Sequence, residues 1–171
     1  MPATNHIEPF LEHKVPDLWC YYCCGQYKKT ANRFIAMPSL RNRVLGVQLY
    51  KFDIKGFLHW GYNFWNSYLS LEKIDPYSVT DAKENYPSGD GFVVYPGSGG
   101  SPVCSLRLEV FYDAIQDLNA LRALEKKIGR ERVIELIDSG LHDKIRFDSF
   151  PHDDRWLLGL REIINRLLAE K

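Results

Sequence analysis

The chain has 171 residues, of which 45% are hydrophobic and 26% charged, so it can build the core of one soluble domain or of part of a larger one. Lysine plus arginine and aspartate plus glutamate each number 22, and this zero balance excludes the basic excess that general nucleic-acid or membrane-surface binding needs. No apolar run approaches the ~20 residues of a membrane-spanning helix.

The N-terminal segment, residues 1–16, is predicted to be a polar loop with one helical turn around 7–13. It has no apolar stretch of the kind found in a signal peptide. Three of the four cysteines, Cys20, Cys23 and Cys24, follow within five residues, which makes a poor disulfide framework. We therefore expect a cytoplasmic location.

A strand, a helix and a second strand are predicted next. Residues 17–24 (DLWCYYCC), closed by Gly25, are typical of a buried strand. Residues 39–52 carry apolar side chains at helical spacing, and Pro38 precedes them as it often precedes a helix. Residues 56–60 (GFLHW) form a second apolar run. This order with short connections indicates a parallel βαβ unit.

A long irregular segment is predicted at 61–90, and loops of that length in compact domains are usually functional. A third strand at 91–95 (GFVVY) leads through a turn at 96–102 into a long helix that Ser105 can cap. Two further helices are predicted at 131–139 and 154–169, and Asp153 or Asp154 can cap the second of them.

The predicted α/β structure is incomplete. Three buried-type strands with these helices would leave open sheet edges and one uncovered face. We therefore predict part of a larger barrel, or a chain that needs a partner. Residues 1–128 would form the barrel part and residues 129–171 a C-terminal helical extension.

The densest aromatic motif is WGYNFW at 60–65, directly after the second predicted strand. In a (β/α) barrel the carboxyl ends of the strands face the active site. Tyrosine and tryptophan rings stack on sugar rings, and Asn63 adds a hydrogen-bond donor and an acceptor. We interpret the motif as a sugar-binding site; the alternative is an aromatic plug that closes the barrel.

No metal, cofactor or catalytic centre is predicted. The cysteines at 20–24 lie in a predicted strand with no second pair at zinc-site spacing, so we interpret them as core residues. We interpret His59 as a buried, satisfied histidine rather than a general base. Most glycosidases need two carboxylates, but none follows a predicted strand end. The candidates considered are Asp53, Asp75, Asp81, Asp90 and Glu109.

Three sequence blocks together resemble the C-terminal part of the catalytic domain of glycoside hydrolase family 123. They are DLWCYYCCGQ, NRFIAMPSLRNRVLGVQLYKFDIKGFLHWGYNFW and GDGFVVYPGSGGSPVCSLRLEVFYDAIQDLNAL, in the family's order over about residues 15–124. The resemblance implies a partial (β/α)8 TIM-type barrel followed by C-terminal helices. Its last three β/α units would have strands at 18–24, 56–60 and 91–95 and a closing helix at 105–127.

The resemblance also implies an activity, that of retaining β-N-acetylgalactosaminidases. In these enzymes the substrate's acetamido oxygen attacks the anomeric carbon, and an adjacent Asp-Glu pair orients that group and protonates the leaving oxygen. The chain contains no adjacent Asp-Glu pair, and in the family the pair lies upstream, so no catalytic residue is assigned. The resemblance implies sugar contacts by Tyr22, Trp60, Tyr62, Asn63 and Trp65.

Three hypotheses follow. The first is part of a glycoside hydrolase that acts on a glycan containing an N-acetylhexosamine only together with the upstream barrel half, and is inactive alone. The second is a non-catalytic carbohydrate-binding module with Trp60, Tyr62 and Trp65 as its stacking platform. The third is a structural remnant that self-associates and has no glycan affinity.

Overall fold

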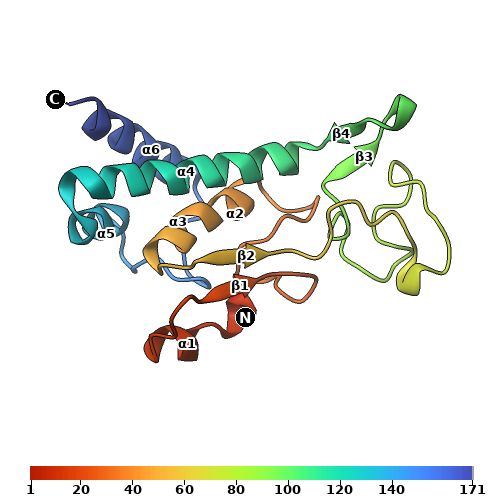
Figure 1. The fold of residues 1–171 in the computed structure, drawn as a ribbon, viewed down its shortest axis with the longest axis horizontal. Coiled ribbons are helices and arrows are strands. Elements are labelled where there is room, and N and C mark those ends of the chain that lie inside the picture. Colours follow the sequence, from red (N-terminus) through yellow and green to blue (C-terminus); the bar gives the residue numbers. More distant parts are fainter. Residues whose placement is uncertain (171) are drawn as a thin grey trace.

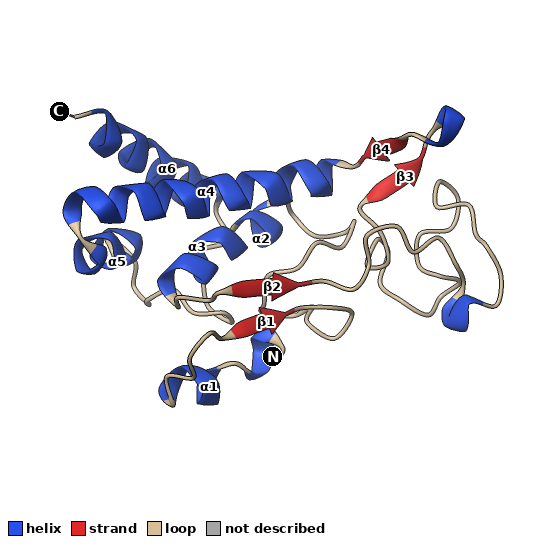
Figure 2. Cartoon of the chain, viewed as in Figure 1, coloured by secondary structure: helices blue, strands red, loops and turns tan. Residues whose placement is uncertain are grey.

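The computed structural model describes residues 1–170 as a mixed α/β chain with two small sheets (Figures 1 and 2). The helices are α1 (Glu8–Glu12), α2 (Leu40–Arg43), α3 (Leu45–Lys51), α4 (Leu106–Ile128), α5 (Arg130–Asp138) and α6 (Asp154–Ala169). The strands are β1 (Trp19–Tyr21), β2 (Gly56–Leu58), β3 (Val94–Pro96) and β4 (Pro102–Cys104). Short 3-10 turns lie at Thr4–His6, Tyr68–Ser70 and Ser98–Gly100. Within the part of the chain that is described, no helix is long and apolar enough to cross a membrane.

The predicted βαβ unit is confirmed. β1 and β2 pair in parallel with Cys20 opposite Phe57, and α2 and α3 connect them. A parallel bridge from Ala3 to Tyr21 adds one more residue on the other side of β1. The two strands are shorter than predicted, because the chain turns at 24–25 after β1 and leaves the sheet at His59 after β2.

One face of the β1–β2 sheet packs against the helices. Cys20 is fully buried there, and the ring of Phe57 lies 5.9 Å from that of Phe111 on α4. The opposite face is open: Trp19 is 49% exposed and Leu58 is 42% exposed. The sheet is therefore covered on one side only, as Figure 1 shows for α3 and α4.

Helices α3 and α4 pack so closely that their backbones are in contact. A Cβ added to Gly46 of α3 would lie 1.9 Å from the carbonyl oxygen of Ala114 on α4, so only glycine fits at this crossing. Asp117 of α4 is 2% exposed and binds Arg43 of α2 at 2.7 Å and Arg161 of α6 at 2.8 Å. This buried carboxylate therefore joins three helices.

The predicted helix boundaries at the C-terminal side are confirmed. The Ser105 side chain accepts a hydrogen bond from the Leu108 amide at the start of α4, and that of Asp153 accepts one from the Arg155 amide at the start of α6. Apolar residues of α4, α5 and α6 belong to the same buried cluster as β1 and α3. The division into residues 1–128 and 129–171 stays a prediction.

The prediction of a third parallel strand at 91–95 is wrong. β3 begins at Val94 and pairs antiparallel with β4, which returns across a glycine-rich turn at 97–101. Phe92, two residues before β3, forms an isolated antiparallel β-bridge with Asn63 and does not join the β1–β2 sheet. A short apolar run carries no information about strand direction, and the local partner across the turn determines it. The two sheets are separate, and the described residues do not close a barrel.

The segment 61–90 is irregular, as predicted, and contains one 3-10 turn at Tyr68–Ser70. Together with the β3–β4 hairpin it forms the end of the molecule opposite α5 and α6 (Figure 2). Its chain returns to the sheet at residues 89–93, where Gly89, Asp90, Gly91, Phe92 and Val93 are all buried. The loop thereby brings Asp90 back to the residues that follow β2.

Candidate functional site

The candidate site lies where β1 and β2 end. Tyr22 follows β1, and His59 and Trp60 follow β2. The rings of Tyr22 and His59 meet edge to face at 5.4 Å. Because the two strands are parallel, their carboxyl ends meet at the same edge of the sheet, as the sequence predicted for a site of this kind.

A buried histidine–aspartate pair forms the base of the site. The Asp90 carboxylate is 0% exposed and lies 3.1 Å from Nε2 of His59. Nδ1 of His59 accepts hydrogen bonds from the Gly61 amide at 3.0 Å and from the Arg33 guanidinium. These partners assign the proton to Nε2, which donates it to Asp90. Burial lowers the pKa of His59, while the hydrogen bond to Asp90 opposes this effect.

Two arginines, Arg33, which is buried, and Arg107, which is half-buried, hold the surrounding backbone. Arg33 donates to the Gly61 carbonyl as well as to His59, and burial lowers its pKa to about 10, which leaves it charged at neutral pH. Arg107, in the first turn of α4, donates to the carbonyl of Gly89 at 2.6 Å and to that of Phe92 at 2.7 Å. Those two carbonyls flank Asp90, so α4 fixes the segment that carries the carboxylate.

The exposed part of the site is an aromatic cluster around Trp60. The Trp60 side chain is 40% exposed, and its ring lies 5.0 Å from Phe64 and 5.2 Å from Tyr86 in tilted or edge-on contacts. Tyr68 extends the cluster by contacting Tyr86 at 5.9 Å. The indole nitrogen of Trp60 donates to Oδ2 of Asp90 at 3.0 Å. We call Trp60, Phe64, Tyr68 and Tyr86 the aromatic cluster.

Tyr22 differs from the other predicted sugar contacts. It is 0% exposed, and its hydroxyl donates to Oδ1 of Asn42 at 2.9 Å. Burial raises its pKa, so the phenol stays neutral. Tyr22 lies beneath the site and supports His59; it has no exposed surface with which to touch a sugar in this structure.

The other predicted contacts lie on the segment that follows Trp60. Tyr62 is 54% exposed, and Asn63 is exposed beside it. Trp65 is half-buried, and its indole nitrogen donates to the Val94 carbonyl at 3.0 Å. Among the described residues no ring contact joins Trp60 to Tyr62 or Trp65, so the motif does not form one continuous platform.

Sequence reasoning missed the role of Asp90 and of Tyr86. In the sequence Asp90 precedes a predicted strand, at the end away from a barrel's active site, and therefore gives no sign of a role. It reaches Trp60 only because the long loop folds back on itself. Tyr86 gave no signal, since a single tyrosine in an irregular segment has no periodicity to place it.

The arrangement is suited to stacking on the apolar face of a ring-shaped ligand rather than to moving protons. Both oxygens of Asp90 accept hydrogen bonds from the protein, and the carboxylate has no access to solvent. The His59 side chain is 4% exposed. Among residues 1–170, no three His, Cys, Asp or Glu side chains lie close enough together to hold a metal ion. All four cysteines are free thiols.

Comparison with known families gives a match. The family model described as "Glycoside hydrolase 123, catalytic domain" matches residues 1–124. The matched range covers the β1–β2 sheet, the long loop, the β3–β4 hairpin and most of α4, and therefore the whole candidate site. No curated protein matches the chain.

Proposed function

The chain belongs to glycoside hydrolase family 123, and we propose that it supplies the sugar-contacting surface of a glycosidase acting on a β-linked N-acetylhexosamine. The observation that carries this proposal is the half-exposed indole of Trp60, held by the buried Asp90 at the carboxyl ends of β1 and β2. An indole ring offers a large apolar face that can stack on the apolar face of a pyranose ring, while its N–H takes a hydrogen-bond partner.

The surroundings of Trp60 explain how it would bind. Phe64 and Tyr86 restrict the indole from the side, and Asp90 fixes its nitrogen. A ring that is already fixed loses little conformational entropy when a ligand binds, which favours affinity. Tyr62 and Asn63, both exposed, are the nearest residues in sequence that can add polar contacts to sugar hydroxyl groups.

We further propose that the β1–β2 sheet is part of a (β/α)8 barrel. The parallel order from Ala3 through β1 to β2, with the helices on one face, is the arrangement of a barrel wall. The open face carries Trp19 and Leu58, which are 49% and 42% exposed. In the proposed assembly this face points into the barrel, and the upstream barrel half covers it. Alternatively, a second copy of the chain could cover this open face through self-association.

The catalytic carboxylates are proposed to come from that upstream half. The sequence has no adjacent Asp-Glu pair. Asp90 is fully buried with both oxygens occupied, and Glu109 is exposed on α4, which packs on the side of the sheet away from its open face. A general acid must reach the glycosidic oxygen, and neither residue is in a position to do so. The chain alone is therefore expected to be inactive.

The test is hydrolysis of a chromogenic N-acetyl-β-galactosaminide. We expect none with residues 1–171 alone, and activity when an upstream barrel half with its Asp-Glu pair precedes the chain in one polypeptide. In that longer protein, Trp60→Ala should lower kcat/KM by about tenfold, equivalent to ~1.4 kcal/mol of lost transition-state binding. Hydrolysis by the short chain would refute the proposal that the carboxylates come from outside it.

A carbohydrate-binding module is the second candidate, and one observation favours it. Trp60 is exposed in the chain as it stands, without any further segment. This alternative predicts saturable glycan binding by residues 1–171 and no hydrolysis by either the short or the longer protein. Binding without hydrolysis in both would therefore favour the module over the enzyme.

A further inference from the structure

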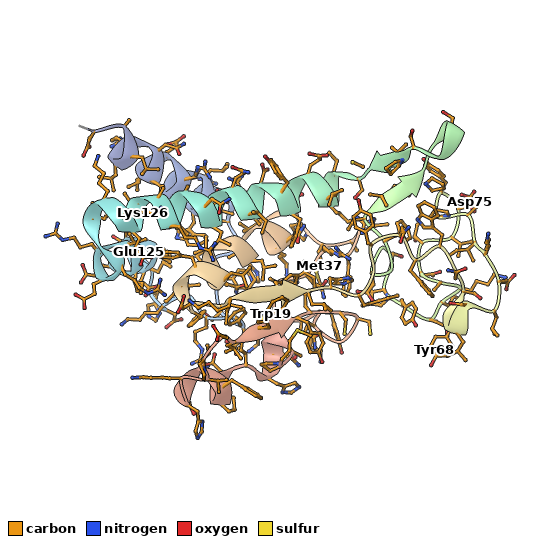
Figure 3. All side chains as sticks on the ribbon, viewed as in Figure 1. Trp19, Met37, Tyr68, Asp75, Glu125 and Lys126 are labelled. Atoms are coloured by element: carbon orange, nitrogen blue, oxygen red, sulfur yellow. The ribbon has the colours of Figure 1, made fainter. Side chains whose placement is uncertain are left out.

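A tight hairpin at residues 65–74 of the long loop carries Tyr68, one member of the aromatic cluster. The Ser67 amide donates to the Glu72 carbonyl at 2.9 Å, and the Ser67 hydroxyl accepts a hydrogen bond from the Glu72 amide at 3.2 Å. Figure 3 shows Tyr68 on this hairpin, at the end of the molecule toward which β1 and β2 run. The hairpin therefore holds Tyr68 beside the candidate sugar site.

The backbone at the tip of this hairpin is strained. Leu69 has a φ of 56° and a ψ of 16°, and Ser70 has a φ of 57°. Both residues lie in the left-handed region, which residues other than glycine rarely adopt because their Cβ crowds the following carbonyl oxygen. Such residues persist only where surrounding contacts hold them, and they gather at ligand-binding sites. The position of Tyr68 is thus fixed by its hairpin.

Tyr68 and Trp60 are exposed rings on either side of Tyr86. Tyr68 is 46% exposed and Trp60 is 40% exposed, whereas Tyr86 is half-buried. The Tyr86 ring centroid lies 5.2 Å from that of Trp60 and 5.9 Å from that of Tyr68. Among residues 1–170 no ring contact joins Trp60 directly to Tyr68. Because the two distances add to about 11 Å at most, the exposed rings are separated by more than one aromatic contact and by no more than two. A disaccharide has the length to cover both rings.

The polar atoms between these two rings are available to a ligand. The hydroxyl groups of Tyr68 and Tyr86 form no hydrogen bond with any residue in the range 1–170. Burial, and after it the neighbouring Tyr68 hydroxyl, raises the pKa of Tyr86, so this phenol stays protonated. Each hydroxyl can donate to a sugar hydroxyl and accept from one. The N–H of Trp60, in contrast, is occupied by Asp90.

We propose that Tyr68 forms a second sugar subsite, so that the surface carried by this chain binds two linked sugar rings rather than one. This inference rests on the proposed function: one ring of the glycan stacks on the Trp60 indole, and the adjoining ring contacts Tyr68. A tyrosine side chain offers an apolar face and a polar tip, which match the apolar face and the hydroxyl groups of a pyranose ring. Tyr68 would then favour an oligosaccharide over a single sugar, because a monosaccharide on Trp60 does not reach it.

The test is titration of residues 1–171 with three ligands, followed by ligand-detected nuclear magnetic resonance. The ligands are methyl N-acetyl-β-galactosaminide and two disaccharides in which the same sugar is joined to methyl galactoside by a β1→3 or a β1→4 linkage. Two linkages are used because the bend of the disaccharide must match the angle between the two rings. We expect at least one disaccharide to bind at least fivefold more tightly than the monosaccharide. Equal affinity for all three ligands would overturn the subsite.

Variants of two exposed tyrosines in the same long loop identify the contact. Tyr68→Ala should reduce the affinity for the disaccharide to that for the monosaccharide and change monosaccharide binding less than twofold. Tyr68→Phe keeps the ring and should retain most of the gain. Tyr77→Ala is the matched control, because Tyr77 is 60% exposed but packs on Tyr95, outside the aromatic cluster. Equal losses in Tyr68→Ala and Tyr77→Ala would contradict the subsite.

The same titrations separate failure of the subsite from failure of the proposed function. If the monosaccharide binds and Trp60→Ala weakens its binding, the sugar site on Trp60 is supported whatever the disaccharides do. Without a gain for either disaccharide, the subsite at Tyr68 alone is then refuted. Absence of saturable binding by all three ligands would overturn both.

Discussion

The indole nitrogen of Trp60 donates to the carboxylate of Asp90 at 3.0 Å, although Trp60 is 40% exposed and Asp90 is 0% exposed. An exposed aromatic side chain is thus tied to a fully buried charge. The second carboxylate oxygen lies 3.1 Å from Nε2 of His59. Asp90 therefore links the surface of the candidate site to its buried base, and its removal should affect both.

Replacing Asp90 by asparagine tests this link. Asparagine keeps one acceptor oxygen but turns an amide donor toward either Trp60 or His59, so one buried donor loses its acceptor. We expect the free energy of unfolding to fall by about 1–3 kcal/mol. The Trp60 ring should also become more mobile. Urea denaturation measures the first effect, and tryptophan fluorescence anisotropy measures the second.

Asp17→Asn is the matched control for that variant. Asp17 is exposed, its carboxylate makes no hydrogen bond to residues 1–170, and its φ of 48° is tolerated by asparagine. Its stability should stay within about 0.5 kcal/mol of the parent protein. If Asp90→Asn unfolds no more easily than Asp17→Asn, the Asp90 carboxylate does not stabilise the site as described.

The buried His59 predicts how stability depends on pH. Its pKa in the folded protein is lowered by burial, against about 6.5 in an unfolded chain. As the pH falls below about 6.5 the unfolded chain binds a proton that the folded protein refuses, so stability falls. Above that pH both states are neutral and His59 contributes no slope. Urea midpoints at about pH 7.5 and about pH 5.5 should therefore differ.

His59→Gln should flatten this dependence, because glutamine does not titrate. His142→Gln should retain it, because the His142 side chain is 98% exposed and its ion pair with Asp143 is at the surface. The comparison uses the difference between the two pH values, so a general loss of stability in His59→Gln does not obscure it. An unchanged difference in His59→Gln would mean that other groups cause the dependence.

The crossing of α3 and α4 makes a prediction about Gly46. An alanine Cβ at this position would lie 1.9 Å from the Ala114 carbonyl oxygen, and backbone atoms on two packed helices cannot move aside easily. Gly46→Ala should therefore lower the free energy of unfolding by about 3 kcal/mol. Chemical denaturation monitored by circular dichroism measures the change.

Gly159→Ala is the opposite case on α6. A Cβ there would meet nothing within 4 Å, so only the helix propensity changes. Alanine is favoured over glycine in a helix by about 1 kcal/mol, and this variant should be more stable than the parent. Destabilisation by both substitutions would show that contact with Ala114 is not the reason for the effect at Gly46.

The buried carboxylate of Asp117 predicts a loss shared by three helices. Asp117→Ala leaves Arg43 and Arg161 without their common partner, and both side chains are partly exposed, at 20% and 28%. Breaking a buried ion pair costs about 3–5 kcal/mol, but solvent around the two arginines reduces this to about 2–3 kcal/mol. Asp113→Ala, an exposed aspartate on the same helix, is the control and should cost far less.

The long elements of the fold could be predicted from the sequence. The helix that begins after Ser105 and the one capped by Asp153 have several turns of apolar spacing and a clear cap, and both begin where predicted. The parallel pairing of β1 and β2 also followed from the helix between them. Periodicity over many residues and known connection rules carry this information.

The third strand could not be predicted, because its partner lies across a turn whose sequence reads only as a loop. Val94 pairs with Cys104 through glycine-rich residues, and Pro102 begins a strand that has only three residues. The base of the site was missed for a related reason. Asp90 and Trp60 are 30 residues apart, and no local pattern indicates that an irregular loop returns to its starting point. Tyr86 joins the aromatic cluster in the same way.

The most direct test of the sugar site is titration of residues 1–171 with methyl N-acetyl-β-galactosaminide, followed by ligand-detected nuclear magnetic resonance. The account predicts saturable binding that Trp60→Ala weakens by about tenfold. Trp19→Ala should retain it, because Trp19 is also half-exposed but lies at the opposite end of the β1–β2 sheet. Equal binding by Trp60→Ala and the parent protein, or no binding by the parent, would contradict the account.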